Sequence, residues 1–148
     1  MDFTNTITIA RAPDDVFRYL ATFENVPRWN PAIIETERTS DGPIGVGTTY
    51  RQVRSKPTPA VEAFTITRFE PATDLAIEGT IGPFEGTLSY RLVPSESGTI
   101  LVNDAHLEGK RVASVVGPLI ARRIAGAVAD NLNALKRLLE EHADAASG

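Results

Sequence analysis

Residues 118–140, PLIARRIAGAVADNLNALKRLLE, carry a helical pattern that decides how the rest of the chain must fold. Their apolar side chains recur at intervals of three and four, which places them on one face of a helix of more than twenty residues. We expect Gly117 and Pro118 to break or kink an initial turn at residues 111–116, RVASVV, and the tail 142–148 to fray. The expected apolar stripe consists of Ile120, Ile124, Val128, Leu132, Leu135 and Leu139.

Short extended runs separated by turn residues precede this helix. The dividers are rich in Gly, Pro, Asp and Ser, and such short connections favour antiparallel neighbours because a parallel pair requires a long crossover. The sequence therefore predicts seven strands in one antiparallel sheet. Their expected ranges are 3–10, 32–39, 47–55, 61–69, 74–81, 84–93 and 99–108.

A pair of short helices is expected between the first two strands. Pro13 suits the first turn of a helix, and Asp14 and Asp15 complement the dipole of that helix. Pro27 and Pro31 leave room for only a short second helix at residues 26–29. The whole chain, 1–148, is then a single α+β domain in which a strongly curved sheet grips the C-terminal helix. The space between them is either a ligand cavity or is filled by side chains.

Five segments of the chain resemble a known family. They are ITIARAPDDVFRYLATFENVPRWNPAI (7–33), SDGPIGVGTTYR (40–51), FEPATDLAI (69–77), GPFEGTLSYRLVPSESGTIL (82–101) and LNALKRLLEE (132–141). Together they resemble the polyketide cyclase/dehydrase and lipid-transport group of the START-like (SRPBCC) superfamily. This resemblance implies a helix-grip fold with a hydrophobic cavity between the sheet and the C-terminal helix. It does not imply one reaction, because the matching residues are turns and core anchors.

The composition of the chain disfavours nucleic acids and the membrane interior as partners. The 148 residues include 15 Lys and Arg against 19 Asp and Glu, a net charge of −4, and no cysteine. The basic residues are scattered, which disfavours a nucleic-acid partner, and no long apolar run predicts stable insertion into a membrane. We expect no cofactor and a monomer or homodimer. The start MDFTNTITIARAP lacks a secretory pattern, so a cytoplasmic location is expected.

The glycines at 42, 45 and 47 raise the question of a phosphate-binding loop. Their spacing is G-x-x-G-x-G, whereas a dinucleotide-binding site needs G-x-G-x-x-G before a helix. A P-loop needs a lysine directly after its last glycine, but Gly47 is followed by Thr48. We interpret them as turn glycines between two strands, at the mouth of the proposed cavity.

Two histidines and one tryptophan are the remaining conspicuous side chains. Alternation along 99–108 sends His106 to the outer face of the sheet, and His142 lies in the tail. No His-x-x-x-His or His-x-x-Glu spacing is present, so we expect no metal site. Trp29 is expected to anchor the short helices or the cavity floor, and its indole N–H needs a partner if it is buried.

Period-two alternation predicts a mostly apolar cavity lining. The C-terminal helix adds Asn131, which falls within the apolar stripe; there it bonds a protein neighbour, a water or a ligand. The expected ligand-binding residues are Trp29, Tyr50, Gln52, Arg54, Glu62, Phe64, Ile66, Ile77, Phe84, Leu88, Tyr90, Asn103, Ala105, Ile124, Val128 and Asn131.

Three functions fit this pattern. The first is binding of a medium-sized hydrophobic ligand of the lipid, polyketide or isoprenoid type, which enters between the C-terminal helix and the DGPIG or KPTP loop. The second is a cyclase or dehydratase in which Glu62 abstracts an α-proton while Tyr50, Tyr90 or Arg54 stabilises the enolate. The third is a protein-interaction module with a collapsed cavity and a partner surface at Ile100 and Val102.

Overall fold

The structure is a computed structural model that describes residues 1–109 and 118–147, with side chains to residue 141. The initial turn predicted at 111–116 and the side chain of His142 lie outside the described residues. Within them, no helix is long and apolar enough to span a membrane.

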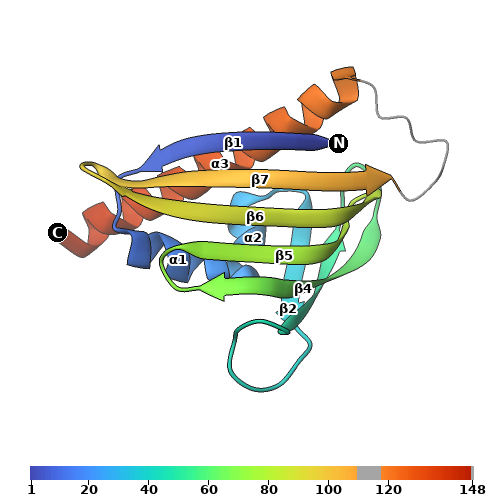
Figure 1. Ribbon diagram of the computed structural model, residues 1–148, viewed down its shortest axis with the longest axis horizontal. Coiled ribbons are helices and arrows are strands. Elements are labelled where there is room, and N and C mark those ends of the chain that lie inside the picture. The colour runs from blue at the N-terminus through green and yellow to red at the C-terminus, as the bar shows by residue number, and fades with distance from the viewer. Residues whose placement is uncertain (110–117, 148) are drawn as a thin grey trace.

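Seven strands form one antiparallel sheet, as the sequence predicts, and their order in it is β1-β7-β6-β5-β4-β3-β2 (Figure 1). Each neighbouring pair except β1–β7 is consecutive in the chain, whereas β1 pairs with the distant β7 from Asp2 opposite His106 to Ile9 opposite Thr99. The helical segment connects β1 and β2, which form the two edges of the sheet. The strands are β1 (Asp2–Ile9), β2 (Ile33–Arg38), β3 (Thr49–Arg54), β4 (Ala60–Glu70), β5 (Asp74–Ile81), β6 (Phe84–Ser95) and β7 (Gly98–Gly109).

Two short helices and one 3-10 turn follow β1. In α1 (Pro13–Ala21), Pro13 opens the first turn beside Asp14 and Asp15, and Val16, Phe17 and Leu20 are buried. The 3-10 turn η1 (Phe23–Asn25) leads into α2 (Val26–Trp29), which packs against β2 and α3. The predicted helix pair is therefore confirmed.

The long C-terminal helix α3 (Pro118–Ser147) crosses behind the sheet (Figure 1). The predicted apolar stripe is buried only in its second half, where Leu132, Leu135 and Leu139 join the main core. In the first half, Ile124 is half-buried and Ile120 is 52% exposed. This difference arises because the first half of α3 borders a cavity instead of packed side chains.

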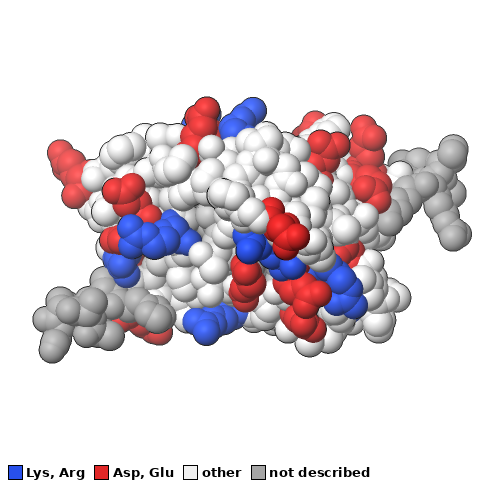
Figure 2. Space-filling view, turned by 90° about the horizontal axis from the view of Figure 1, so that it is seen from below, with Lys and Arg blue, Asp and Glu red and all other residues white. Residues whose placement is uncertain are grey.

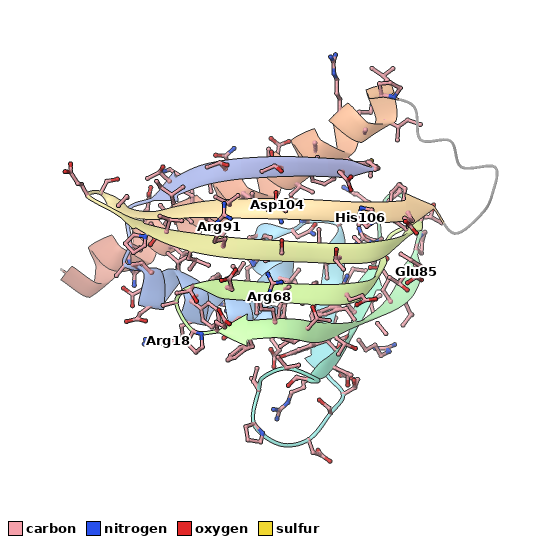
Figure 3. All side chains as sticks on the ribbon, in the orientation of Figure 1. Arg18, Arg68, Glu85, Arg91, Asp104 and His106 are labelled. Atoms are coloured by element: carbon pink, nitrogen blue, oxygen red, sulfur yellow. The ribbon has the colours of Figure 1, made fainter. Side chains whose placement is uncertain are left out.

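The outer face of the sheet is turned away from α3 and carries polar side chains. Arg91, Asp104 and His106 lie on this face (Figure 3), and the predicted outward position of His106 is confirmed. Its Nδ1 is hydrogen-bonded to Asp2. Figure 2, which views the molecule from below relative to Figure 1, shows basic and acidic side chains interspersed on the side that it displays.

The loop between β2 and β3 turns the chain with two glycines in the left-handed region. Gly42 has φ of 91° and Gly47 has φ of 94°, conformations that side chains with a Cβ rarely adopt. The turn role of these glycines is confirmed. Figure 1 shows this loop projecting from the lower edge of the sheet, away from α3.

Candidate ligand cavity

A cavity of about 900 Å³ lies between the concave face of the sheet and the first half of α3. Its wall is mostly apolar, with side chains from β3 to β7, from α2 and from α3. The lining consists of Phe3, Phe23, Val26, Trp29, Asn30, Pro31, Ala32, Gln52, Arg54, Lys56, Pro57, Phe64, Ile77, Ile81, Gly82, Pro83, Phe84, Leu88, Tyr90, Leu107, Ile120, Arg123, Ile124, Ala127, Val128 and Asn131.

The exposed part of this lining marks the cavity mouth. It comes from the β3–β4 loop at Lys56 and Pro57, the β5–β6 turn at Pro83, and the start of α3 at Ile120 and Arg123. The predicted entrance at the KPTP loop agrees with this lining. The DGPIG loop contributes no residue to it, so its predicted place at the mouth is wrong. The reason is that the loop continues the far edge of the sheet, which α3 does not cover.

A buried ion pair lies beside the mouth. The Glu62 carboxylate accepts hydrogen bonds from Arg54 Nε at 2.6 Å and Arg54 Nη2 at 3.1 Å. It also accepts one from Gln52 Nε2 at 2.8 Å and one from the backbone N–H of Gly82 at 2.8 Å. Each oxygen thus has two donors, and the carboxylate ties β3 and β4 to the β5–β6 turn. Gln52 and Arg54 line the cavity, whereas Glu62 does not.

Tyr50 belongs to the core and not to the cavity wall. Its ring stacks on Phe64 with centroids 5.2 Å apart and planes inclined by 15°, and Phe23 meets it edge-on at 5.0 Å. The side chain is fully buried. Among the described residues, its hydroxyl has no hydrogen-bond partner.

Tyr90 does face the cavity, from the middle of β6. Its side chain is 6% exposed, and burial raises the pKa of the phenol to about 12. The hydroxyl therefore stays protonated over the physiological pH range and acts as a hydrogen-bond donor in an apolar enclosure.

The structure places most of the predicted ligand-binding residues together on this wall. Five lie outside the lining: Tyr50, Glu62, Ile66, Asn103 and Ala105. All five are buried. Alternation assigns them to the inner face correctly, but it does not tell whether a cavity or a packed neighbour covers each position.

Several lining residues were not predicted. Arg123 and Ala127 carry a usable signal, since they lie eight and four residues before Asn131, respectively, and therefore on the same helical face. Lys56, Pro57, Gly82 and Pro83 lie in turns, where no periodic pattern shows which side of the chain faces inward.

Within the described part of the chain, the cavity wall consists of apolar, neutral polar and basic side chains. Among residues 1–109 and 118–141, no three His, Asp or Glu side chains lie together as ligands of a metal ion would. The lining itself includes no Asp, Glu or His from this part of the chain, and its charged residues are Arg54, Lys56 and Arg123.

Solved structures with the same fold support this description. A START superfamily protein from Mycobacterium smegmatis shares 19% identity, with a TM-score of 0.78 over 95% of this chain and 97% of that one. The Zhui aromatase/cyclase from Streptomyces sp. R1128 shares 18% identity, with a TM-score of 0.76 over 100% and 98%.

A third similar structure is longer than this chain. The di-domain ARO/CYC StfQ from the steffimycin biosynthetic pathway shares 17% identity, with a TM-score of 0.76. The match covers 97% of this chain and 51% of that one, so this chain spans about half of the di-domain protein. At these identities the three structures establish the fold alone. No curated protein sequence matches the chain.

The family assignment rests on the sequence itself. The family model described as polyketide cyclase / dehydrase and lipid transport matches residues 1–140, which include the whole sheet and most of α3. The helix-grip architecture and the cavity under α3 agree with that match. The chain therefore belongs to the polyketide cyclase / dehydrase and lipid transport family.

Proposed function

We propose that this protein binds a medium-sized hydrophobic molecule of the lipid, polyketide or isoprenoid type in the cavity between the sheet and α3. The observation that carries the proposal is the open, mostly apolar cavity of about 900 Å³. Pockets for small molecules are typically roughly 300–1,000 Å³, mostly apolar, with a few polar groups that fix orientation. Membership in the family supports a ligand-binding role in general.

Two alternatives from the sequence fit less well. A cyclase or dehydratase needs a base within reach of the substrate, but Glu62 lies outside the lining and its oxygens already accept four hydrogen bonds. An interaction module needs a collapsed cavity, whereas this cavity is open. Its proposed partner surface, Ile100 and Val102, is half-buried.

Trp29 supplies a direct test, because it is the single tryptophan and lines the cavity. Binding of the neutral probe N-phenyl-1-naphthylamine is expected to quench Trp29 emission by energy transfer. Val128→Phe fills cavity space and should abolish probe binding. Asn133→Phe places the same ring on the exposed side of α3 and should leave it intact.

Native mass spectrometry of the purified protein would identify any small molecule that co-purifies with it. A co-purifying apolar small molecule that is lost in Val128→Phe supports the proposal. Absence of both a co-purifying molecule and probe binding to the unmodified protein would contradict it.

A further inference from the structure

The cavity has an inner end that differs from its mouth. The α3 residues in the lining end at Asn131, and the next residue, Leu132, is buried in the main core. Trp29 and Tyr90 also belong to this core, whereas Phe84 at the outer part of the wall belongs to a separate, smaller cluster. Trp29, Tyr90 and Asn131 therefore lie where the cavity closes.

Tyr90 brings an unused donor to this inner end. The side chain is 6% exposed, and burial is the only cause of its raised pKa, with no hydrogen bond from the described residues contributing. Tyr90 lines the cavity, whereas the Tyr50 hydroxyl and the Trp29 indole N–H are fully enclosed without a partner among the described residues. A buried hydroxyl without a partner costs about 1–3 kcal/mol, so an acceptor in the cavity would be stabilised by it.

Asn131 adds a second neutral polar group. It is half-buried in the lining, and its amide makes no hydrogen bond with the described residues. An amide offers both donors and an acceptor, so it suits a carbonyl or a hydroxyl equally. The indole N–H of Trp29 is a third donor near this end, and it is enclosed in the wall with no acceptor among the described residues.

Formal charges are confined to the mouth. Lys56 and Arg123 lie at the exposed rim, and the charge of Arg54 is balanced by Glu62. Nothing among the described residues at the inner end balances a carboxylate or an ammonium group. Because an unpaired charge is costly to bury, the inner end selects for an uncharged group.

We propose that Tyr90 and Asn131 form a neutral polar subsite that binds an uncharged oxygen acceptor, such as a ketone or ester carbonyl, at the inserted end of an otherwise apolar ligand. This inference rests on the proposed function, since it names the chemistry of the ligand that the same cavity takes. It assigns Tyr90 a role in binding that needs no proton transfer.

Three probes of equal chain length test the subsite: 2-undecanone, undecane and undecanoic acid, each measured by displacement of N-phenyl-1-naphthylamine. Tyr90→Phe should weaken the binding of 2-undecanone about three- to tenfold, the value of one net hydrogen bond, and should leave the affinity for undecane unchanged. Undecanoate, with its charge at the mouth, should be insensitive to Tyr90→Phe.

The chain provides a matched control in Tyr50, which is buried without a hydroxyl partner but lies outside the lining. Tyr50→Phe makes the identical chemical change and should leave the affinity for 2-undecanone intact. Asn131→Leu should weaken 2-undecanone binding in the same direction as Tyr90→Phe. The infrared carbonyl stretch of bound 2-undecanone gives a readout in the unmodified protein, where it should move to lower frequency than in an alkane solvent.

The outcomes separate the two proposals. An unchanged affinity for 2-undecanone in Tyr90→Phe, an equal loss for 2-undecanone and undecane in that variant, or an unshifted carbonyl stretch would overturn the subsite while ligand binding stands. Failure of all three probes and of N-phenyl-1-naphthylamine to bind would overturn the proposed function and the subsite together.

Discussion

Arg54 and Glu62 form a two-point ion pair across neighbouring strands, with Nε and Nη2 of the guanidinium 2.6 and 3.1 Å from the carboxylate oxygens. The side chain of Glu62 has no exposed area, and that of Arg54 is 11% exposed. The pair is thus a buried one, in which each charge depends on the other. Beside the cavity mouth, Glu62 also accepts a hydrogen bond from the backbone N–H of Gly82 and so holds the β5–β6 turn in place.

Replacement of Glu62 by alanine is therefore expected to destabilise the fold strongly. The change leaves the Arg54 charge buried without a counter-ion, and breaking a buried pair in this way costs about 3–5 kcal/mol. The free energy of unfolding, measured by urea denaturation with circular dichroism, checks this value. Arg68→Ala is the control, because the Arg68–Asp74 pair spans 3.9 Å with Arg68 58% exposed, and such pairs contribute roughly 0–1 kcal/mol. A similar loss of unfolding free energy in both variants would show that the buried Arg54–Glu62 pair stabilises the fold no more than an exposed ion pair does.

Tyr50→Phe is expected to be tolerated, although Tyr50 is among the most deeply buried side chains. The substitution keeps the ring stacked on Phe64 and removes a hydroxyl that has no partner among the described residues. Since an unsatisfied buried hydroxyl is unfavourable, the free energy of unfolding should stay the same or rise by about 1 kcal/mol.

Tyr50→Ala is the contrasting variant, because it also removes the ring. It should cost about 3–5 kcal/mol by analogy with other buried aromatic truncations. Thermal denaturation of both variants measures the difference. A clear destabilisation by Tyr50→Phe would mean that the hydroxyl has a partner, such as an ordered water.

The sequence predicted the sheet and its helices well because their signals are local. Alternation of apolar residues set the faces of the strands, and turn residues set their limits to within a few positions. His106 is an example: a count along β7 sent it outward, and it is exposed there. The register of β1 against β7, by contrast, pairs the first strand of the chain with the last, and such a long-range pairing leaves no local pattern in the sequence.

The cavity lining could be predicted only in part. Whether an inward-facing side chain lines the cavity depends on whether a side chain from another element packs over it. The sequence does not distinguish Tyr50 from Tyr90, since alternation along the strand places both side chains on the inner face of the sheet. Phe23 from η1 covers Tyr50, whereas the first half of α3 leaves Tyr90 open to the cavity. That distinction requires the three-dimensional placement of η1 and α3.

The pairing of His106 with Asp2 on the outer face is expected to respond to pH. The hydrogen bond from His106 raises the pKa of the imidazole above 6.5, and the same bond lowers the pKa of Asp2 below 3.8. The contribution of His106 to stability is fully present below pH 6.5 and is lost as pH rises through its raised pKa. The contribution of Asp2 is present above pH 3.8 and is lost as pH falls through its lowered pKa.

Asp2→Asn tests this assignment by nuclear magnetic resonance titration of the His106 ring protons. The imidazole pKa should fall toward its ordinary value, because Asp2 is the largest cause of the shift. Glu108→Gln is the matched control: its carboxylate lies 3.4 Å from His106 Nε2 and contributes less, so the fall should be smaller. The reverse order of the two variants would contradict the assignment.

The two halves of α3 are expected to differ in how much they stabilise the fold. Leu135 has no exposed area and packs in the main core, so Leu135→Ala should lower the free energy of unfolding by about 2–5 kcal/mol. Ile120 is 52% exposed at the cavity mouth, and Ile120→Ala should cost about 0.5 kcal/mol or less. Urea denaturation of both variants in the absence of ligand measures the contrast. Equal costs would mean that the first half of α3 packs as tightly as the second, which is incompatible with an open cavity beneath it.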